Sequence, residues 1–382
     1  MPLFIGLMSG TSLDGIDAAL VEIAGETATP RLLAHHAEPM PTLLRERLWG
    51  LCHADAARFA DLAAAEEAFC GLQAAAVDAL LAESHTPREA VAAIGSHGQT
   101  IEHAPYGHAS GSHADGPAYT LQLDNPSRLA ELTGIAVVAD FRRRDLAAGG
   151  QAAPLAPAFH QALFRAPEQW RLVLNLGGFA NLTLLPPLED PRAPLGFDSG
   201  PANALLDAWH ARHRGGAFDA DGTWAASGRV DEALLARLLE EPFFHRPPPR
   251  STGRELFHLD WLMSRLRGDE RPEDVQATLA ELTATSVALA VEMARERLEA
   301  PSPERLIPCG GGAHNRDLLA RLACRLPEAR LDDAAEWGWP ADWLEAGAFA
   351  WLAHRRLAGL PGNLPSVTGA TGPRVLGGVY AP

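Results

Sequence analysis

The sequence predicts an α/β protein built from two duplicated lobes. Its 382 residues exceed the size at which one hydrophobic core usually stops growing, so two domains are expected. A strand, a small polar turn and a second strand open the chain at 3–23, and the same pattern returns at 171–185. This recurrence indicates an ancient duplication in which both turns face one cleft. We place the lobes at 1–168 and 169–382, with the boundary near 166–169.

Composition and charge exclude several function classes. The formal charge of -16 argues against a nucleic-acid partner, which would need clustered basic residues. The chain contains no lysine, which excludes a Walker A loop and Schiff-base chemistry. The N-terminus lacks a signal-peptide pattern, and no apolar run of roughly 18 residues is found, so a cytoplasmic protein without a membrane span is expected. The four scattered cysteines fit reduced thiols.

The remaining elements follow from hydrophobic periodicity. Apolar residues spaced three and four apart predict helices, and short apolar runs between turn residues predict strands. Further strands are expected at 31–37, 92–96, 119–123, 135–139 and 306–309. Helices are expected at 41–51, 55–81, 127–133, 154–164, 204–212, 230–239, 259–266, 275–298, from 316 onward, and at 343–357. A Gly/Pro-rich tail starts at Pro361, and we expect Asn363, Ser366 and Thr368 at its surface.

The first turn, from Ser9 to Gly15, is rich in hydroxyl groups and glycine. Such a turn has little side-chain bulk, so its hydroxyls and backbone N–H groups suit a loop that wraps phosphate oxygens. Asp14 and Asp17 would repel phosphate unless Mg²⁺ bridged them, and Mg²⁺ is commonly held by one or two carboxylates plus substrate phosphates. A polar hairpin turn without a ligand explains the same residues.

Two later stretches of the first lobe also carry polar groups after a strand. His97 and Gln99 lie among small residues at 95–100, which indicates a ligand-facing loop or a plain βα turn. Three arginines at 142–144 need carboxylates or an anionic ligand, and salt bridges to Asp140 and Asp145 could supply them. A third stretch bears three histidines, whose irregular spacing favours a mobile loop over a metal site: His103, His108 and His113.

Three stretches of the second lobe carry candidate site residues. The glycine turn at 177–181 repeats the position of the first turn. Asp198 stands just before an expected helix with Pro201 at its first position, so it is either a helix cap or a functional carboxylate. The glycines at 310–312 resemble a dinucleotide fingerprint with Asn315 in place of its final glycine, and we expect the adenosine side of a nucleotide there.

With these stretches assembled, the chain resembles the anhydro-N-acetylmuramic acid kinases along nearly its full length. Several long motifs in one order make the resemblance highly specific. They are GLMSGTSLDGID from Gly6, GSHGQTI from Gly95, VVADFRRRD from Val137, LNLGGFANLT from Leu174, FDSGPAN from Phe197, STGRE from Ser251, CGGGAHN from Cys309 and EAGAFAWLAHR from Glu345.

The resemblance implies the actin-like ATPase (ribonuclease H-like) fold, with two duplicated lobes and an interlobe cleft that binds ATP. It implies a kinase that uses ATP and water to convert 1,6-anhydro-N-acetylmuramic acid into N-acetylmuramic acid 6-phosphate during peptidoglycan recycling. The expected cofactors are ATP and Mg²⁺. The expected partners are the sugar and a second copy of the chain, with no nucleic acid and no membrane.

The motifs also assign roles to single residues. Asp198 would be the catalytic base and Arg144 the active-site arginine, while Asp14 and Asp17 would hold Mg²⁺, directly or through water. The ATP phosphates would lie against Gly10, Thr11, Ser12, Leu13, Asp14, Gly15, Ile16 and Asp17, and against Gly177, Gly178 and Asn181; Gly310, Gly311 and Gly312 would border adenosine; His97, Gln99 and Glu345 would contact the sugar.

The chain departs from the family pattern at three usual glycines, where it has Asp124, Ala152 and Ala202. A side chain there costs on the order of 1 kcal/mol if the backbone needs a positive φ.

Three other functions fit parts of the sequence: a kinase of the same fold acting on an ordinary sugar hydroxyl, a serine hydrolase using Ser12, and an ATP-dependent interaction module without catalysis. The hydrolase would need glycine where Asp14 stands.

Overall fold

A computed structural model describes residues 2–54, 56–107, 116–253 and 256–382. His108 and His113 therefore lie outside the described residues. The chain forms two compact units: unit 1 comprises Met1–Leu163 with Trp343–Pro382, and unit 2 comprises Phe164–Asp342. This corrects the expectation that 169–382 forms a single lobe, because the last forty residues return to the first unit.

Unit 1 is a seven-stranded sheet with helices packed on it. Its strands are β1 (Leu3–Ser9), β2 (Gly15–Glu22), β3 (Arg31–Pro39), β4 (Val91–Ala104), β5 (Tyr119–Leu123), β6 (Val137–Ala139) and β12 (Gly378–Tyr380). Its helices are α1 (Thr42–Cys52), α2 (Phe59–Glu83), η1 (Arg88–Ala90), α3 (Pro126–Thr133), α4 (Arg143–Ala147), α12 (Leu344–Leu357) and α13 (Pro365–Thr368), and α5 (Ala156–Phe164) leads into unit 2.

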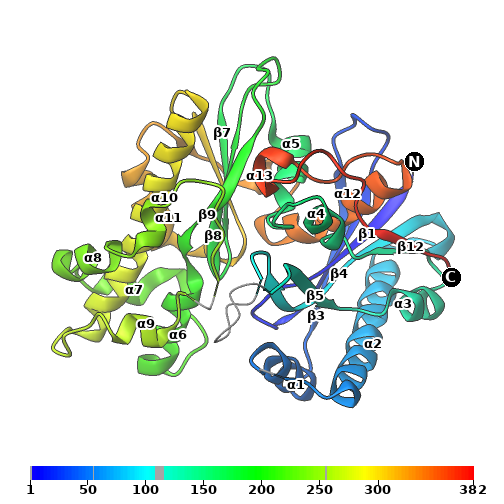
Figure 1. Ribbon diagram of the computed structural model, residues 1–382, viewed down its shortest axis with the longest axis horizontal. Coiled ribbons are helices and arrows are strands. Elements are labelled where there is room, and N and C mark those ends of the chain that lie inside the picture. The colour runs from blue at the N-terminus through cyan, green and yellow to red at the C-terminus, as the bar shows by residue number, and fades with distance from the viewer. Residues whose placement is uncertain (1, 55, 108–115, 254–255) are drawn as a thin grey trace. The chain divides into compact units, whose positions relative to one another are not determined.

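The C-terminal segment belongs to unit 1 because α12 is seated directly on its central strands. Figure 1 shows these orange and red segments beside the blue N-terminal strands, with both chain ends in this unit. A methyl group added at Gly6 of β1 would lie 1.8 Å from the Ala346 carbonyl oxygen, and one added at Gly95 of β4 would lie 2.0 Å from the Phe349 carbonyl oxygen. Only glycine permits so close an approach of helix and strand.

Unit 2 contains a five-stranded sheet and two apolar clusters. Its strands are β7 (Arg171–Leu176), β8 (Phe179–Leu185), β9 (Leu195–Pro201), β10 (Arg305–Cys309) and β11 (Arg330–Leu331). Its helices are α6 (Asn203–Arg214), η2 (Ala220–Gly222), α7 (Thr223–Ser227), α8 (Glu232–Leu239), η3 (Pro242–His245), α9 (Leu259–Met263), α10 (Pro272–Leu298), η4 (Gly311–His314), α11 (Arg316–Arg325) and η5 (Ala334–Trp337), and η6 (Ala341–Trp343) leads back to unit 1.

The two sheets repeat one topology, which confirms the predicted duplication. In unit 1, β1, β2 and β3 form an antiparallel meander, while β4 pairs parallel to β1 and β6 parallel to β4. In unit 2, β7, β8 and β9 form the same meander, while β10 pairs parallel to β7 and β11 parallel to β10. The β1–β2 turn and the β7–β8 turn therefore occupy equivalent positions in their own sheets.

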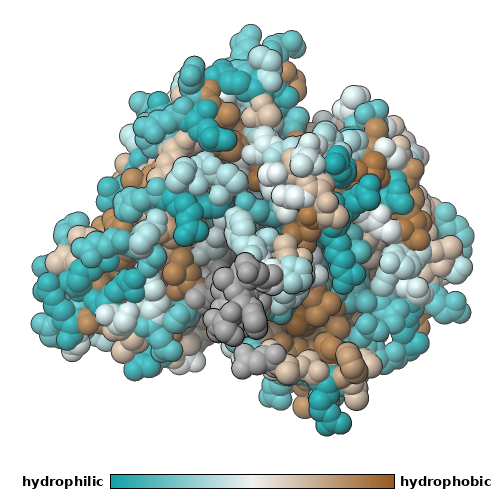
Figure 2. Space-filling model, viewed as in Figure 1, coloured by the Kyte–Doolittle hydropathy of each residue, from teal (hydrophilic) through white to brown (hydrophobic). Residues whose placement is uncertain are grey.

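The longest helix, α10, is largely buried between Val275 and Ala294 and packs against β8 and β9. By length and composition alone it could cross a membrane, but 72% of its apolar window is buried inside the protein. A long helix that is mostly buried is typical of a protein core. The exterior of unit 2 near α7 and α8 is mainly hydrophilic on the face shown in Figure 2.

Three local expectations are wrong. The stretch 95–100 is part of strand β4 rather than a loop, because it pairs with β1 on one side and β5 on the other. Asn363 and Thr368 are buried rather than superficial, because both donate hydrogen bonds to the buried Asp145 carboxylate, at 2.6 and 2.8 Å. Pro201 ends β9 instead of starting a helix.

Candidate active site

In unit 1, buried polar groups of β1 and the neighbouring strand β4 support the β1–β2 turn. Ser9 Oγ lies 2.7 Å from Gln99 Oε1, and Gln99 Nε2 donates to the Gly10 carbonyl oxygen at 3.4 Å. Gln99, predicted as a sugar contact, is thus a buried support of the turn. Leu13 anchors the tip: its side chain is buried, its φ is 59°, and its carbonyl accepts from Arg45 Nε at 2.8 Å.

The two carboxylates predicted for Mg²⁺ differ in environment. Asp14 has 73% of its side chain exposed and forms an ion pair with Arg45. Asp17 is half-buried in β2, opposite Met8 of β1. Among the described residues, no group of three or more histidine, cysteine or acidic side chains could hold a metal ion by itself. Two carboxylates with water and phosphate oxygens are nevertheless a suitable ligand set for Mg²⁺.

The glycines predicted to contact ATP fall into two classes. A methyl group added at Gly10, Gly177 or Gly178 would meet no atom closer than 3.7 Å, and one at Gly311 would meet nothing within 4 Å. Internal packing therefore does not require glycine at these four positions, whereas backbone that approaches an external ligand does use glycine. Gly310 and Gly312 are required internally, because an added methyl would lie 2.4 Å from Asn175 Oδ1 and 2.6 Å from Leu176 Cβ, respectively.

Also in unit 1, His97 lies against Arg142. His97 Nε2 accepts hydrogen bonds from Arg142 Nη2 at 2.9 Å and Nε at 3.2 Å, and its ring packs on Phe349 of α12. Burial, and secondarily Arg142, holds the pKa of His97 well below its usual range, so this imidazole is neutral. Burial lowers the pKa of Arg142 to about 10, while the charge of Glu345 acts in the opposite direction.

His97, Arg142 and Glu345 come from three segments of unit 1 that the sheet and α12 bring together. Glu345 is half-buried in the first turn of α12, His97 lies in β4, and Arg142 directly precedes α4. Arg142 also donates to the Ala152 carbonyl oxygen at 2.6 Å. The sequence alone does not distinguish Arg142 from its two neighbours, although the place of Arg142 just after β6 is a usable signal.

Arg144, the arginine named by the motif match, has a different environment. It is exposed on α4 and lines a hollow together with Gly149, Thr371 and Arg374. Arg143 pairs with Asp140 at 3.6 Å. Within unit 1, the structure therefore brings His97 together with Arg142 and places Arg144 elsewhere.

In unit 2, Asp198 lies in β9 opposite Asn181 of β8. The register shifts at the next position, which leaves Ser199 as an extra residue, and such a bulge re-aims neighbouring side chains. The Thr252 N–H donates to Asp198 Oδ2 at 2.8 Å. Asp198 is not a helix cap, because α6 begins at Asn203 and has no side-chain cap at its N-terminus.

Arg250 fixes the backbone around Asp198. Its Nε donates to the Asp198 carbonyl oxygen at 2.9 Å, and the Asp198 N–H donates to the Arg250 carbonyl oxygen at 3.2 Å. Its Nη1 lies within 3.0 Å of three backbone carbonyl oxygens, those of Phe243, Phe244 and Arg246. Burial lowers the pKa of Arg250 to about 10, with Asp198 acting in the opposite direction. Arg250 is not among the residues predicted from the sequence, although it directly precedes the STGRE motif.

The other loops of unit 2 are tied together by backbone bonds. The Asn203 N–H donates to the Gly177 carbonyl oxygen at 3.1 Å, and the Ala202 and Ala204 N–H groups both donate to the Gly178 carbonyl oxygen at 3.0 Å. Asn315 is the N-cap of α11, with Oδ1 accepting from the Leu318 N–H at 3.0 Å. This capping role explains an asparagine where a dinucleotide fingerprint would have glycine.

The three departures from family glycines have different outcomes. Ala152 has φ 59°, so the expected strain applies there. Ala202 has φ −127°, and Asp124 is not among the residues with positive φ, so neither carries that penalty. Asp124 instead accepts a hydrogen bond from Ser96 Oγ at 2.7 Å, and burial raises its pKa to about 6.

Comparisons with known proteins identify the family. The family model described as anhydro-N-acetylmuramic acid kinase matches residues 2–382. A relative of that name from Chromohalobacter salexigens is 64% identical over the full length of both chains. Another from Pseudomonas paraeruginosa is 51% identical over 100% of this chain and 99% of its own. A dehydratase component A from Acidaminococcus fermentans covers 94% of this chain and 100% of its own at 11% identity and a TM-score of 0.49, too distant to carry an argument. On the first three findings, the chain belongs to the anhydro-N-acetylmuramic acid kinase family.

Proposed function

We propose that this protein phosphorylates 1,6-anhydro-N-acetylmuramic acid with ATP while opening its anhydro ring, giving N-acetylmuramic acid 6-phosphate and ADP. Membership of a kinase family implies ATP use and a small-molecule substrate. The observation that carries the mechanism is Asp198, a half-buried carboxylate held in place by Thr252 and Arg250 on a bulged strand. Such a group suits proton transfer.

In the proposed reaction, Asp198 takes a proton from water as the water oxygen attacks the anomeric carbon. The bond from that carbon to the 6-oxygen breaks, as in glycoside hydrolysis by inversion. The 6-oxygen then takes the γ-phosphoryl group, and the bond between that phosphorus and the ADP oxygen breaks. Phosphoryl transfer needs positioning and charge neutralisation more than covalent help from the protein.

We assign the remaining roles by environment. The open glycines Gly10, Gly177, Gly178 and Gly311 approach ATP, and Asp14 and Asp17 would hold Mg²⁺, which when bound neutralises phosphate charge. His97, as a neutral imidazole, and Glu345 contact the sugar. We assign the active-site arginine to Arg142 rather than Arg144, because Arg142 binds His97. Thr11, Ser12, Leu13, Gly15, Ile16 and Asn181 complete the phosphate loops, with Gly310 and Gly312 beside adenosine, and we further propose a cytoplasmic homodimer.

A substrate comparison tests this function. The protein is incubated with ATP, Mg²⁺ and either the anhydro sugar or free N-acetylmuramic acid, and ADP and sugar phosphate are measured. We expect rapid turnover with the anhydro sugar and little with the free sugar. Preferred phosphorylation of the free sugar would instead identify an ordinary sugar kinase, and ATP binding without either product an interaction module.

The role of Asp198 is tested by Asp198→Asn, with the exposed Asp269→Asn as the matched control. We expect Asp198→Asn to bind ATP normally and to lose about 10²- to 10⁴-fold in kcat, because it cannot accept the proton. In ¹⁸O-labelled water, wild-type product analysed before anomeric exchange should carry label at the anomeric hydroxyl. Label in the phosphate, or normal turnover by Asp198→Asn, contradicts the assignment.

A further inference from the structure

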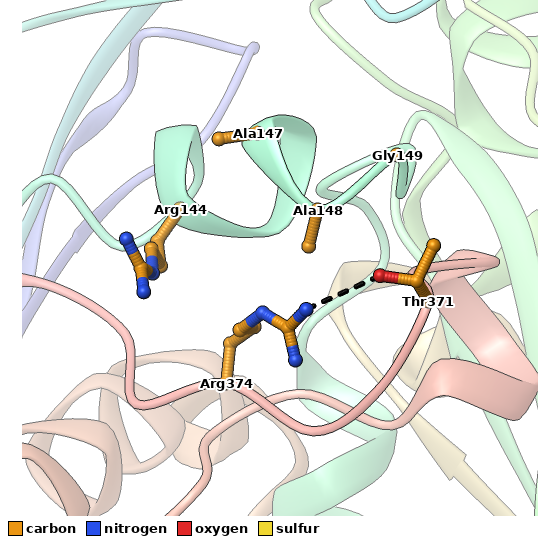
Figure 3. Close-up of a pocket in the computed structure, with 6 residues that line it drawn as sticks. All are labelled: Arg144, Ala147, Ala148, Gly149, Thr371 and Arg374. Carbon is orange, nitrogen blue, oxygen red and sulfur yellow. Dashed lines mark hydrogen bonds between the residues drawn. The ribbon is translucent and has the colours of Figure 1, made fainter.

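Two adjoining hollows of about 430 and 720 Å³ lie beside α4 in unit 1. They share Arg144, Ala147 and Arg374, so they form one continuous depression, which we call the arginine hollow. Figure 3 shows Arg144 projecting from α4 and Arg374 from the C-terminal tail, with the Arg374 guanidinium directed to the Thr371 hydroxyl.

The arginine hollow is strongly positive within an acidic protein. Four arginines and one aspartate line its larger part: Arg143, Arg144, Arg356, Arg374 and Asp140. Asp140 pairs with Arg143. Within the described parts of the chain, no salt bridge joins Arg144, Arg356 or Arg374 to a carboxylate. At least three guanidinium charges therefore face this surface without a neutralising group.

Internal contacts do not account for these charges. The Arg374 guanidinium donates to neutral oxygens, the Pro373 carbonyl oxygen at 2.9 Å and the Thr371 hydroxyl at 3.2 Å. Arg356 has a buried Nε with no hydrogen-bond partner among the described residues. Its position in the last turn of α12 suits the helix dipole, but that explanation does not extend to Arg144 on α4 or to Arg374 in the tail.

The other carboxylate of this segment, Asp145 in α4, does not line the hollow and is already engaged. Asp145 accepts hydrogen bonds from Asn363 Nδ2, Thr368 Oγ1 and the Ala152 N–H at 2.6 to 2.8 Å, and it is fully buried. These bonds fix α4 and the tail against each other, and so hold Arg144 and Arg374 on opposite sides of the hollow. Gathered like charges repel, and an anion with several oxygens relieves that repulsion through guanidinium hydrogen bonds.

We propose that the arginine hollow binds a phosphate group, as inorganic phosphate or as a sugar phosphate, at a site separate from the residues assigned to catalysis. Arg356 and Arg374 supply guanidinium donors, and the Thr371 hydroxyl at the rim can donate while accepting from Arg374. A phosphate-bearing molecule bound in the hollow would contact α4, which directly follows Arg142, and α12, which carries Glu345 in its first turn.

Titration calorimetry of the full chain, saturated with Mg²⁺ and ADP to fill the nucleotide site, tests this proposal. Inorganic phosphate and glucose 6-phosphate are the two probes, and they distinguish free phosphate from a sugar phosphate. The wild type is compared with the double variant Arg356→Gln/Arg374→Gln. The control is Arg31→Gln, which removes an exposed arginine paired with Glu22 in the same unit.

We expect the wild type and Arg31→Gln to bind one of the probes with equal Kd, and the double variant to bind it at least tenfold more weakly. ADP affinity and Tm should agree among the three proteins, which excludes loss of folding. Equal probe affinity in the double variant, or no saturable binding by the wild type, overturns the proposal. So does a dimer-to-monomer change in the double variant with unchanged affinity, which would identify a subunit contact. These outcomes are independent of whether the anhydro sugar is phosphorylated.

Discussion

At the residue scale, arginine carries every strong positive charge in this lysine-free chain, and burial separates the roles. Arg142 is half-buried and binds a neutral histidine. Arg250 is buried in a cage of carbonyl oxygens behind Asp198. Exposed arginines such as Arg31 form surface ion pairs, which contribute little to stability. Arg142 and Arg250, which hold His97 and Asp198, are thus the arginines whose loss should affect activity.

Arg142 and Arg144 give opposite expectations when each is changed to alanine. Arg142→Ala removes both hydrogen bonds to His97 and a positive charge near Glu345, so we expect kcat/KM for the sugar to fall at least tenfold, about 1.4 kcal/mol. Arg144→Ala should have a smaller effect, with Arg143→Ala as control. Steady-state kinetics with the sugar varied measures this, and a larger loss in Arg144→Ala would return the role to Arg144.

Arg250 is a positioning residue for Asp198. Arg250→Met leaves the carbonyl oxygens of Asp198 and Phe244 without their donor, so we expect the free energy of unfolding to fall by about 1–3 kcal/mol. We also expect kcat to fall while KM for ATP stays constant, because the carboxylate shifts without loss of nucleotide contacts. Arg250→Lys should recover part of kcat. A fully folded Arg250→Met protein with unchanged kcat would show a purely structural role.

Asp124 makes stability depend on pH. Burial raises the pKa of its carboxyl from 3.8 to about 6, so the folded state binds this proton more tightly than the unfolded state. Its contribution is most favourable at low pH and is lost as pH rises from about 4 to about 6. We expect the stability of Asp124→Asn relative to wild type to rise by about 3 kcal/mol over that window and to stay constant above it. Denaturant unfolding at pH 4, 5, 6 and 7 measures the difference, and a difference that does not change with pH would contradict it.

At the element scale, the contact of α12 with β1 and β4 couples stability to the sugar site. The same helix that lies on Gly6 and Gly95 carries Glu345 in its first turn and packs Phe349 on His97. A displacement of α12 therefore moves both side chains. Gly6 and Gly95, although buried beneath α12, thereby set the position of site residues.

Gly6→Ala tests this coupling. The added methyl would overlap the Ala346 carbonyl oxygen, so α12 must shift, and we expect a loss of about 3 kcal/mol or more with a raised KM for the sugar. Gly71→Ala is the matched control, because it lies in α2 with nothing within 4 Å of the added methyl and should gain about 0.5–1 kcal/mol. Thermal unfolding and kinetics provide the measurements. Equal stability of both variants would mean that α12 is not held by this contact.

At the scale of the whole molecule, the chain leaves unit 1, completes unit 2 and returns. Unit 2 is one continuous segment with its own apolar clusters, whereas unit 1 requires α12 and β12 from the C-terminus. The first 163 residues alone would expose the glycine face of β1 and β4 that α12 covers.

This organisation predicts unequal behaviour of fragments. We expect 164–342 to unfold cooperatively on its own, because its sheet and α10 are complete. Residues 1–163 should lack cooperative unfolding and regain it when 343–382 is fused through a flexible linker. Calorimetry of the three fragments checks this, and a cooperative transition in 1–163 would show that α12 is dispensable.

The sequence by itself determined the family, the duplication and most elements, because glycine turns, alternating apolar residues and long motifs are local signals. Only the tertiary structure decided which residues meet. It placed 343–382 in unit 1, put 95–100 in a strand, buried Asn363 and Thr368, and paired His97 with Arg142. Each of these outcomes depends on a partner distant in sequence: α12 on β1, β5 on β4, Asp145 beneath the tail. Periodicity and turn chemistry report the chain's own neighbours, whereas burial and pairing are set by packing between segments that the sequence keeps apart.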